Sequence, residues 1–83
     1  MLGVKVYGAD WCEDTRHTRA FLDRLGVAYE YVNIEQDERA AAWVRERNDG
    51  KERKPTVDVG GQVLCVPSDH DLTGALRERG LMA

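Results

Sequence analysis

Cysteines and long hydrophobic runs are both scarce in this sequence, and the two scarcities exclude several classes of protein. Only Cys12 and Cys65 occur among the 83 residues, whereas a disulfide scaffold of this size usually carries more cysteines. Paired C-x-x-C motifs, which are typical of zinc sites, do not occur in the sequence. The longest apolar run covers residues 40–44, far fewer than the roughly 20 that a membrane helix needs. We therefore expect a domain without a disulfide framework, a paired-cysteine zinc site or a membrane partner.

An excess of basic charge is lacking as well. The sequence contains twelve Lys and Arg residues and fifteen Asp and Glu residues, for a net charge of -3. A nucleic-acid-binding protein, in contrast, needs a basic face. We therefore expect no nucleic-acid partner. The N-terminus has neither a basic leader nor an apolar signal core, which predicts a cytoplasmic protein. The length fits a single domain over residues 1–83, and we expect a monomer.

The first half of the chain has a clear alternation of strand and helix patterns. Alternating apolar residues predict a strand over 2–7, and an apolar stripe predicts a helix over 13–25 that ends at Gly26. A segment rich in Tyr, Val and Ile predicts a strand over 28–34, followed by a helix over 38–48. A strand, a helix and a strand in this order predict a parallel strand pair with a right-handed crossover.

The second half predicts a hairpin and a last helix. Segments 55–59 and 62–66 are rich in β-forming residues and are joined by the pair Gly60-Gly61, a typical hairpin turn. Ser68 can cap the helix that follows. The predicted inner face of this helix contains Leu72, Ala75 and Leu76. The order β-α-β-α-β-β-α predicts an α/β fold with a mixed sheet.

Cys12 comes at the expected junction of the first strand and the first helix. A helix start presents unpaired amide hydrogens and the positive end of the helix dipole, and both favour the reactive thiolate. The acidic pair 13–14 opposes a neighbouring thiolate, whereas Arg16, Arg53 and Lys54 could offset it. The alternative interpretation is a small buried residue, since free cysteine is among the most often buried residue types. The position at a helix start favours a reactive thiol.

Three short motifs accompany this order of elements. They are Trp11-Cys12-x-x-Thr15 after the first strand, Pro55-Thr56 at the third strand, and Pro67-Ser68-Asp69 before the last helix. Together they resemble the glutaredoxin family, including its mycoredoxin-like bacterial members, over essentially the whole chain. The resemblance implies a thioredoxin-like fold, in which a four-stranded mixed sheet is flanked by helices, and a thiol–disulfide oxidoreductase activity.

The resemblance also implies roles for individual residues. Cys12 would be the catalytic nucleophile and Pro55 the cis-proline beside it, with the backbone of Lys54 placed to pair with an incoming thiol-containing peptide. Ser68 and Asp69 would hold a carboxylate of a low-molecular-weight thiol, glutathione or mycothiol-like, that serves as co-substrate. Disulfide-containing proteins would be the other partners, and no metal is expected.

Thr15 stands where dithiol members of the family carry their second cysteine. Because threonine cannot form a disulfide, we expect a monothiol mechanism. In this mechanism Cys12 attacks a mixed disulfide, becomes thiolated and is released by a second small thiol. The hydroxyl of Thr15 either donates a hydrogen bond to the Cys12 sulfur or helps to cap the helix. The replacement also predicts a weak activity.

Cys65 is a candidate second thiol. The Gly-Gly turn would pair Thr56 with Cys65 and place Cys65 at the Pro55 end of the sheet. We favour a strand residue that packs under the last helix. The alternative is an unconventional resolving cysteine for Cys12, which requires Cα atoms within about 7 Å.

Several other residues leave alternatives open. Trp11 either shields the thiol or binds substrate, or it is a partly buried aromatic residue. Thr56 would shape the substrate groove together with Pro55. Trp43 is predicted to pack in the core. His17 is poorly placed for a Cys/His dyad. The segment 69–71, Asp-His-Asp, is more typical of a helix start than of a metal site.

Two other functions remain as alternatives to the oxidoreductase. The first is a redox-weak thioredoxin-fold module that binds a partner through the same groove. The second is an iron–sulfur carrier, because some single-cysteine glutaredoxins share a cluster between two subunits. The sequence Glu13-Asp14-Thr15 differs from the small-residue motif of those carriers, so this alternative ranks last.

Overall fold

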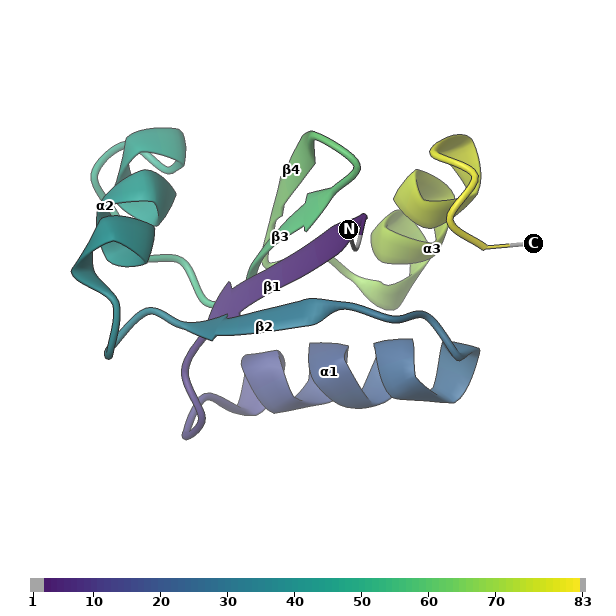
Figure 1. The fold of residues 1–83 in the computed structure, drawn as a ribbon, viewed down its shortest axis with the longest axis horizontal. Coiled ribbons are helices and arrows are strands. Elements are labelled where there is room, and N and C mark those ends of the chain that lie inside the picture. Colours follow the sequence, from purple (N-terminus) through teal and green to yellow (C-terminus); the bar gives the residue numbers. More distant parts are fainter. Residues whose placement is uncertain (1–2, 83) are drawn as a thin grey trace.

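Within residues 3–82, which the computed structural model describes, four strands and three helices follow one another in the predicted order (Figure 1). The strands are β1 (Val4–Gly8), β2 (Glu30–Asn33), β3 (Thr56–Val59) and β4 (Gln62–Cys65). The helices are α1 (Glu13–Leu25), α2 (Glu38–Arg47) and α3 (Asp69–Glu78). None of these helices combines the length and the apolar character that crossing a membrane requires.

The four strands form one mixed sheet in the order β2-β1-β3-β4. β1 and β2 are parallel, with Val6 opposite Tyr31. β3 is antiparallel to both β1 and β4. The hairpin turn between β3 and β4 has positive φ at Gly60 and Gly61, 57° and 98°, a conformation that glycine adopts without steric cost. The predicted mixed sheet and its Gly-Gly hairpin are therefore confirmed.

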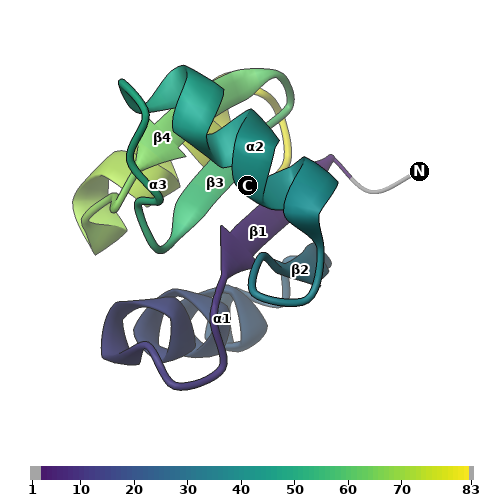
Figure 2. The same cartoon turned by 90° about the vertical axis from the view of Figure 1, so that its left-hand side faces the viewer.

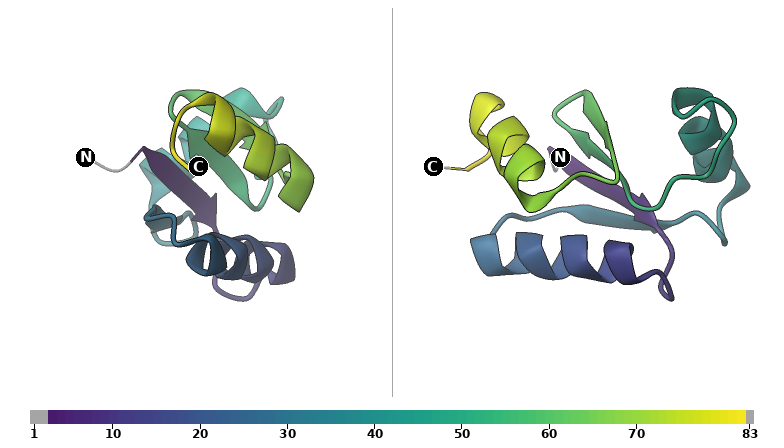
Figure 3. Two further views of the ribbon diagram at one scale, coloured as in Figure 1. Left: turned by 90° about the vertical axis from the view of Figure 1, so that its right-hand side faces the viewer. Right: turned by 180° about the vertical axis from the view of Figure 1, so that it is seen from behind.

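Helices cover the two faces of this sheet unequally. Successive strand residues point to opposite faces. Val6 therefore packs with Leu22 of α1 and Leu72 of α3, whereas its neighbour Tyr7 packs with Val44 of α2. Figure 2 shows α1 and α2 on opposite sides of β1 and β2. Figure 3 shows the β3–β4 hairpin between α2 and α3. The arrangement is the thioredoxin-like fold that the resemblance implies.

The helix limits agree with the prediction because they depend on local signals. α1 ends where expected, with Gly26 at φ 72°, in the left-handed conformation that ends many helices. The side chain of Asp37 accepts a hydrogen bond from Ala40 N and begins α2. The Ser68 hydroxyl accepts one from Asp71 N and begins α3. The predicted inner face of α3 is buried at Leu72, Ala75 and Leu76.

The strand limits are narrower than predicted. The segment expected to run over 28–34 forms a strand only over Glu30–Asn33, opposite residues 5–8 of β1. In the hairpin, Pro55 precedes β3 because it has no amide hydrogen to donate. Val66 follows β4 with φ 44°, outside the extended range. The first predicted strand begins at residue 2, which lies outside the described residues, and β1 runs from Val4 to Gly8.

Candidate functional site

Cys12 is the first residue of the site, and the turn after β1 places it at the N-cap of α1. Its amide donates to the Ala9 carbonyl at 3.1 Å, and its carbonyl accepts from Arg16 N at 3.0 Å. The thiol takes no part in capping the helix. Cys12 is half-buried and forms no disulfide. The sulfur therefore lies at the N-terminal end of α1, where the unpaired amides of the helix begin.

The loop before β3 supplies the second part of the site. The thiol of Cys12 donates to the Lys54 carbonyl at 3.7 Å, across 42 positions of sequence. The peptide bond between Lys54 and Pro55 is cis, and the Pro55 side chain is buried. The structure therefore brings together Cys12, Lys54 and Pro55.

Trp11 lies beside the thiol and is exposed over 62% of its surface. Its Nε1 donates to Glu35 Oε2 at 2.7 Å, and the Lys54 ammonium lies 5.7 Å from the ring centroid. Trp11 is therefore not a core residue, and its role in shielding the thiol or binding substrate stays a prediction. Glu35 was not a candidate, because no sequence pattern links a residue after β2 to the turn after β1.

Thr15 does not take either of the roles expected for it. Its side chain is buried, and its hydroxyl accepts a hydrogen bond from Ala9 N at 3.5 Å. Within residues 3–82, no hydrogen bond joins this hydroxyl to the Cys12 sulfur or to an amide of α1. The reason is packing, since the side chain fills the space above Gly8, where an added Cβ would lie 2.6 Å from Thr15 Cγ2. Thr15 therefore fastens α1 to the end of β1.

Charged groups around Cys12 pair mostly with one another. Arg16 lies 3.7 Å from the Glu13 carboxylate and also donates to the Asp10 carbonyl at 3.4 Å. Lys54 Nζ lies 3.9 Å from Glu52. Two of the cations expected to offset the acidic residues near Cys12, Arg16 and Lys54, thus have acidic partners of their own.

The turn that carries Trp11 and Cys12 is also fastened to β2. The Tyr31 hydroxyl donates to Asp10 Oδ1 at 2.7 Å, and Arg19 lies 3.9 Å above the Tyr31 ring. Burial, and then the hydrogen bond to Asp10, raise the pKa of Tyr31 to about 12. Deprotonation of Tyr31 would cost this contact.

The start of α3 lies against α1. Asp69 Oδ1 is 2.9 Å from Nε2 of His17, which is consistent with the expectation that His17 is poorly placed for a dyad with Cys12. Ser68 uses its hydroxyl to cap α3. Among the described residues, no group of three or more potential ligands could hold a metal ion.

Cys65 is paired with Thr56 as predicted, but it does not pack under α3. Its side chain is exposed. The adjacent Leu64 packs toward the α1–α3 core, so the Cys65 side chain points to the opposite face of the sheet. The main chain nevertheless keeps Cys65 near the site, since Val66 N donates to the Pro55 carbonyl at 2.8 Å.

Thr56 is buried and therefore does not line a groove with its side chain. Its hydroxyl donates to the Arg53 carbonyl at 2.9 Å and accepts from Asn48 Nδ2 at 3.2 Å. Thr56 thus fixes the loop that carries Lys54. A groove of about 390 Å³ lies between β4 and α3. Its lining includes Leu64, Cys65, Pro67, His70 and Asp71.

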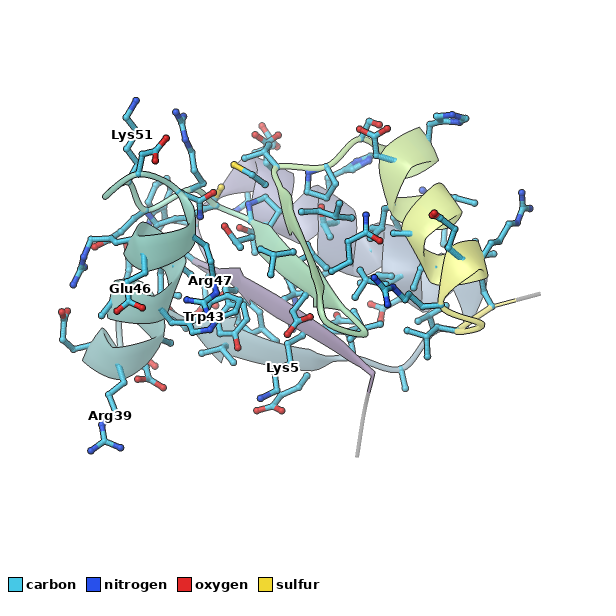
Figure 4. The ribbon with its side chains drawn as sticks, turned by 90° about the horizontal axis from the view of Figure 1, so that it is seen from above. Lys5, Arg39, Trp43, Glu46, Arg47 and Lys51 are labelled. Carbon is cyan, nitrogen blue, oxygen red and sulfur yellow. The ribbon has the colours of Figure 1, made fainter. Side chains whose placement is uncertain are left out.

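The face covered by α2 has its own aromatic stack. Trp43 stacks on Tyr7 with ring centroids 4.6 Å apart, and Arg47 lies 4.2 Å above the Trp43 ring. Figure 4 shows Trp43 and Arg47 together at the sheet-facing side of α2. The prediction that Trp43 serves packing is confirmed.

Comparison with known families identifies the chain. The family model described as Glutaredoxin matches residues 4–64. The chain belongs to the glutaredoxin family. The match in this glutaredoxin includes Cys12, Lys54 and Pro55, whereas Cys65, Ser68 and Asp69 lie beyond it.

Individual relatives agree with this assignment. Mycoredoxin 1 of Corynebacterium glutamicum is 40% identical over 57 residues, 69% of this glutaredoxin and 70% of the relative. A mutant thioredoxin-like protein is 26% identical, with a TM-score of 0.82 over 93% of this chain and 97% of its own. Glutaredoxin from Archaeoglobus fulgidus is 25% identical, with a TM-score of 0.75 over 93% and 88% of the two chains. Buckwheat glutaredoxin in complex with glutathione is 22% identical, has a TM-score of 0.76 over 98% and 82%, and supports the fold alone. Family membership indicates thiol–disulfide oxidoreductase activity.

Proposed function

We propose that this glutaredoxin reduces mixed disulfides by a monothiol mechanism through Cys12. The observation that carries the proposal is the place of the sulfur, half-exposed at the start of α1 and 3.7 Å from the Lys54 carbonyl. A helix start favours the thiolate, which is the attacking species in thiol–disulfide exchange. The carbonyl beside Pro55 is an acceptor for the backbone of a disulfide-containing peptide.

The mechanism proceeds in two exchanges. The Cys12 thiolate attacks the sulfur of the small thiol in a protein mixed disulfide, so that a Cys12–small-thiol disulfide forms and the protein thiolate leaves. A second small-thiol thiolate then attacks that disulfide. This step releases the oxidised small thiol, a symmetric disulfide, and regenerates the Cys12 thiolate. Thr15 has no sulfur for an internal exchange, so the second small thiol is required.

The small thiol would bind beside Cys12 and reach the start of α3. Free amides at the helix start near Ser68 and Asp69 suit a carboxylate of the thiol, and Trp11, Lys54 and Pro55 would contact the thiol near the Cys12 sulfur. Glutathione and a mycothiol-like thiol are the two candidates for this co-substrate. The scheme uses no metal and one subunit, and we place the reaction in the cytoplasm, where small thiols keep proteins reduced.

An assay of mixed-disulfide reduction tests this scheme. Wild type, Cys12→Ser and Cys65→Ser are compared with glutathione and with mycothiol as co-substrates. We expect Cys12→Ser to abolish turnover and Cys65→Ser to leave it close to wild type, because only Cys12 exchanges with substrate. Turnover by Cys12→Ser, or loss of turnover in Cys65→Ser with the fold intact, would contradict the scheme.

A second candidate function is a binding module that uses the same groove without efficient turnover. It is favoured by the acidic Glu13, which is almost fully exposed and near Cys12, and by the presence of Thr15 in place of a second cysteine. The pH profile of Cys12 alkylation separates the two candidates. Alkylation that becomes rapid only above about pH 8.5, as for an ordinary thiol, favours the binding module. A third candidate, an iron–sulfur carrier, is contradicted if the protein stays colourless after anaerobic cluster reconstitution.

A further inference from the structure

The indole of Trp11 is held in a fixed position next to the catalytic sulfur. It is the more exposed of the two large apolar side chains at the surface of the described residues, at 62% against 41% for Val66. An exposed tryptophan with no partner would sample several rotamers. Trp11 instead has two contacts that fix its edge and its face, one to Glu35 and one to Lys54.

Glu35 holds the edge of the ring. Its Oε2 accepts the indole N–H at 2.7 Å, and a hydrogen bond to a carboxylate is about twice as strong as a neutral one. The backbone of Glu35 is itself fixed, since its amide donates to Asn33 Oδ1 at 2.9 Å. The preceding residue, Ile34, is buried, and its amide donates to the Gly8 carbonyl at 2.9 Å. The carboxylate therefore extends from a rigid turn at the end of β2.

Lys54 lies over the Trp11 ring and also contacts the thiol of Cys12. Its ammonium is 5.7 Å from the Trp11 ring centroid, within the range of a cation–π interaction. Its carbonyl accepts from the Cys12 thiol. Lys54 thus contacts both the Trp11 ring and the Cys12 thiol, so the indole lies at the edge of the proposed reaction site.

We propose that Glu35 is a positioning residue, which holds the Trp11 ring as a platform for the apolar side chain that flanks the disulfide-bonded cysteine of a protein substrate. The inference rests on the proposed function, because it assigns the platform to the protein half of the mixed disulfide. A preformed platform lowers the entropy lost on binding. Glu35 would therefore act on KM for the protein disulfide and leave kcat unchanged, since no contact joins it to the exchanging sulfur atoms.

The first test measures steady-state kinetics on a mixed disulfide between a peptide and the small thiol, with an apolar residue beside the peptide cysteine. Variants are Glu35→Ala, Glu35→Gln, Trp11→Ala and the double variant of Glu35→Ala with Trp11→Ala. We expect Glu35→Ala to raise KM about threefold to tenfold, the order that one hydrogen bond confers, with kcat within about twofold. Glu35→Gln should raise KM less than Glu35→Ala, because its amide oxygen still accepts the indole N–H in a weaker, neutral hydrogen bond. Glu46→Ala removes the same charge from α2 and is the matched control.

The double variant decides whether Glu35 acts through the ring. If it does, Trp11→Ala raises KM at least as much as Glu35→Ala, and the double variant adds no further increase. Additive effects, or an unchanged KM in Trp11→Ala, would overturn the proposal. An unchanged KM in Glu35→Ala would overturn it as well.

A spectroscopic measurement keeps the inference separate from the proposed function. In a Trp43→Phe background Trp11 is the single tryptophan, so its emission maximum and its quenching by acrylamide, which is uncharged, report the ring alone. We expect Glu35→Ala to increase quenching more than Glu35→Gln, whose amide oxygen still accepts the indole N–H. If wild type lacks turnover but this change is seen, the oxidoreductase scheme and the platform fail while the Glu35–Trp11 contact stands. If quenching is unchanged in Glu35→Ala, the positioning role itself is wrong.

Discussion

At the scale of single residues, Thr15 shows how a family motif position can acquire a structural task. The side chain is buried against Gly8, and its hydroxyl is the acceptor for the buried amide of Ala9. A cysteine at this position would face the nucleophile in a dithiol enzyme. Here Thr15 instead packs between the end of β1 and the start of α1, next to the turn that carries Cys12.

Replacing Thr15 by valine tests this task. Thr15→Val keeps the shape of the side chain but leaves the Ala9 N–H buried without an acceptor, which should lower the free energy of unfolding by about 1–3 kcal/mol. Urea unfolding followed by circular dichroism measures the change. Thr15→Ser, which keeps the hydroxyl, is the control and should lose only about 1 kcal/mol for the missing methyl group. A valine variant as stable as wild type would show that the hydroxyl contributes nothing.

At the scale of elements, the start of α3 has two tasks in the proposed scheme. The Ser68 hydroxyl caps the helix by accepting from Asp71 N at 3.1 Å, and in the proposed scheme the amides beside it would hold a carboxylate of the small thiol. Asp37 caps α2 in the same way, by accepting from Ala40 N at 3.1 Å. The two caps therefore form a matched pair, of which one adjoins the site.

Substitution of each cap separates stability from binding. Ser68→Ala and Asp37→Ala should each lower the free energy of unfolding by about 1 kcal/mol, because each leaves a helix amide without its side-chain acceptor. Thermal unfolding measures this loss. KM for the small thiol should rise in Ser68→Ala alone. An equal KM in both variants would remove α3 from the proposed binding site.

The sequence predicts these elements well because their limits depend on neighbours in the chain. The Gly26 amide donates to carbonyls at the end of α1, and the side chains of Asp37 and Ser68 accept from amides, all within about four positions. Strand alternation is equally local. The contacts that complete the site are not local. Trp11 meets Glu35 across 24 positions, and His17 meets Asp69 across 52. The prediction for Cys65 is wrong for a similar reason. Strand alternation predicts that Leu64 and Cys65 point to opposite faces of the sheet, but it does not predict which of the two faces α3 covers.

At the scale of the whole molecule, the bond between Tyr31 and Asp10 links stability to alkaline pH. The pKa of Tyr31 rises from 10.0 to about 12, first through burial and then through this hydrogen bond. Between these two values the unfolded chain binds fewer protons than the folded one, so stability falls as the pH rises. The contribution of Tyr31 is complete below pH 10 and is lost as the pH passes through about 12.

A comparison of the unfolding free energies of wild type and Tyr31→Phe should reveal this contribution. The stability of wild type should exceed that of the variant by a constant amount below about pH 10, and the gap should narrow toward pH 12. Urea unfolding at a series of pH values measures it. Tyr7, whose pKa burial also raises, is present in both proteins and cancels in the comparison. A gap that stays constant up to pH 12 would contradict the assignment.

The guanidinium of Arg45 has a further consequence for work with this protein. It donates to Glu38 and to Glu52, each at 2.6 Å, and so ties α2 to the loop that ends in Lys54. Because these groups are partly solvent-accessible, dissolved ions weaken their attraction. The contact between α2 and the loop that ends in Lys54 therefore weakens as the ionic strength rises. Rates of thiol exchange by this protein should be compared only at the same salt concentration.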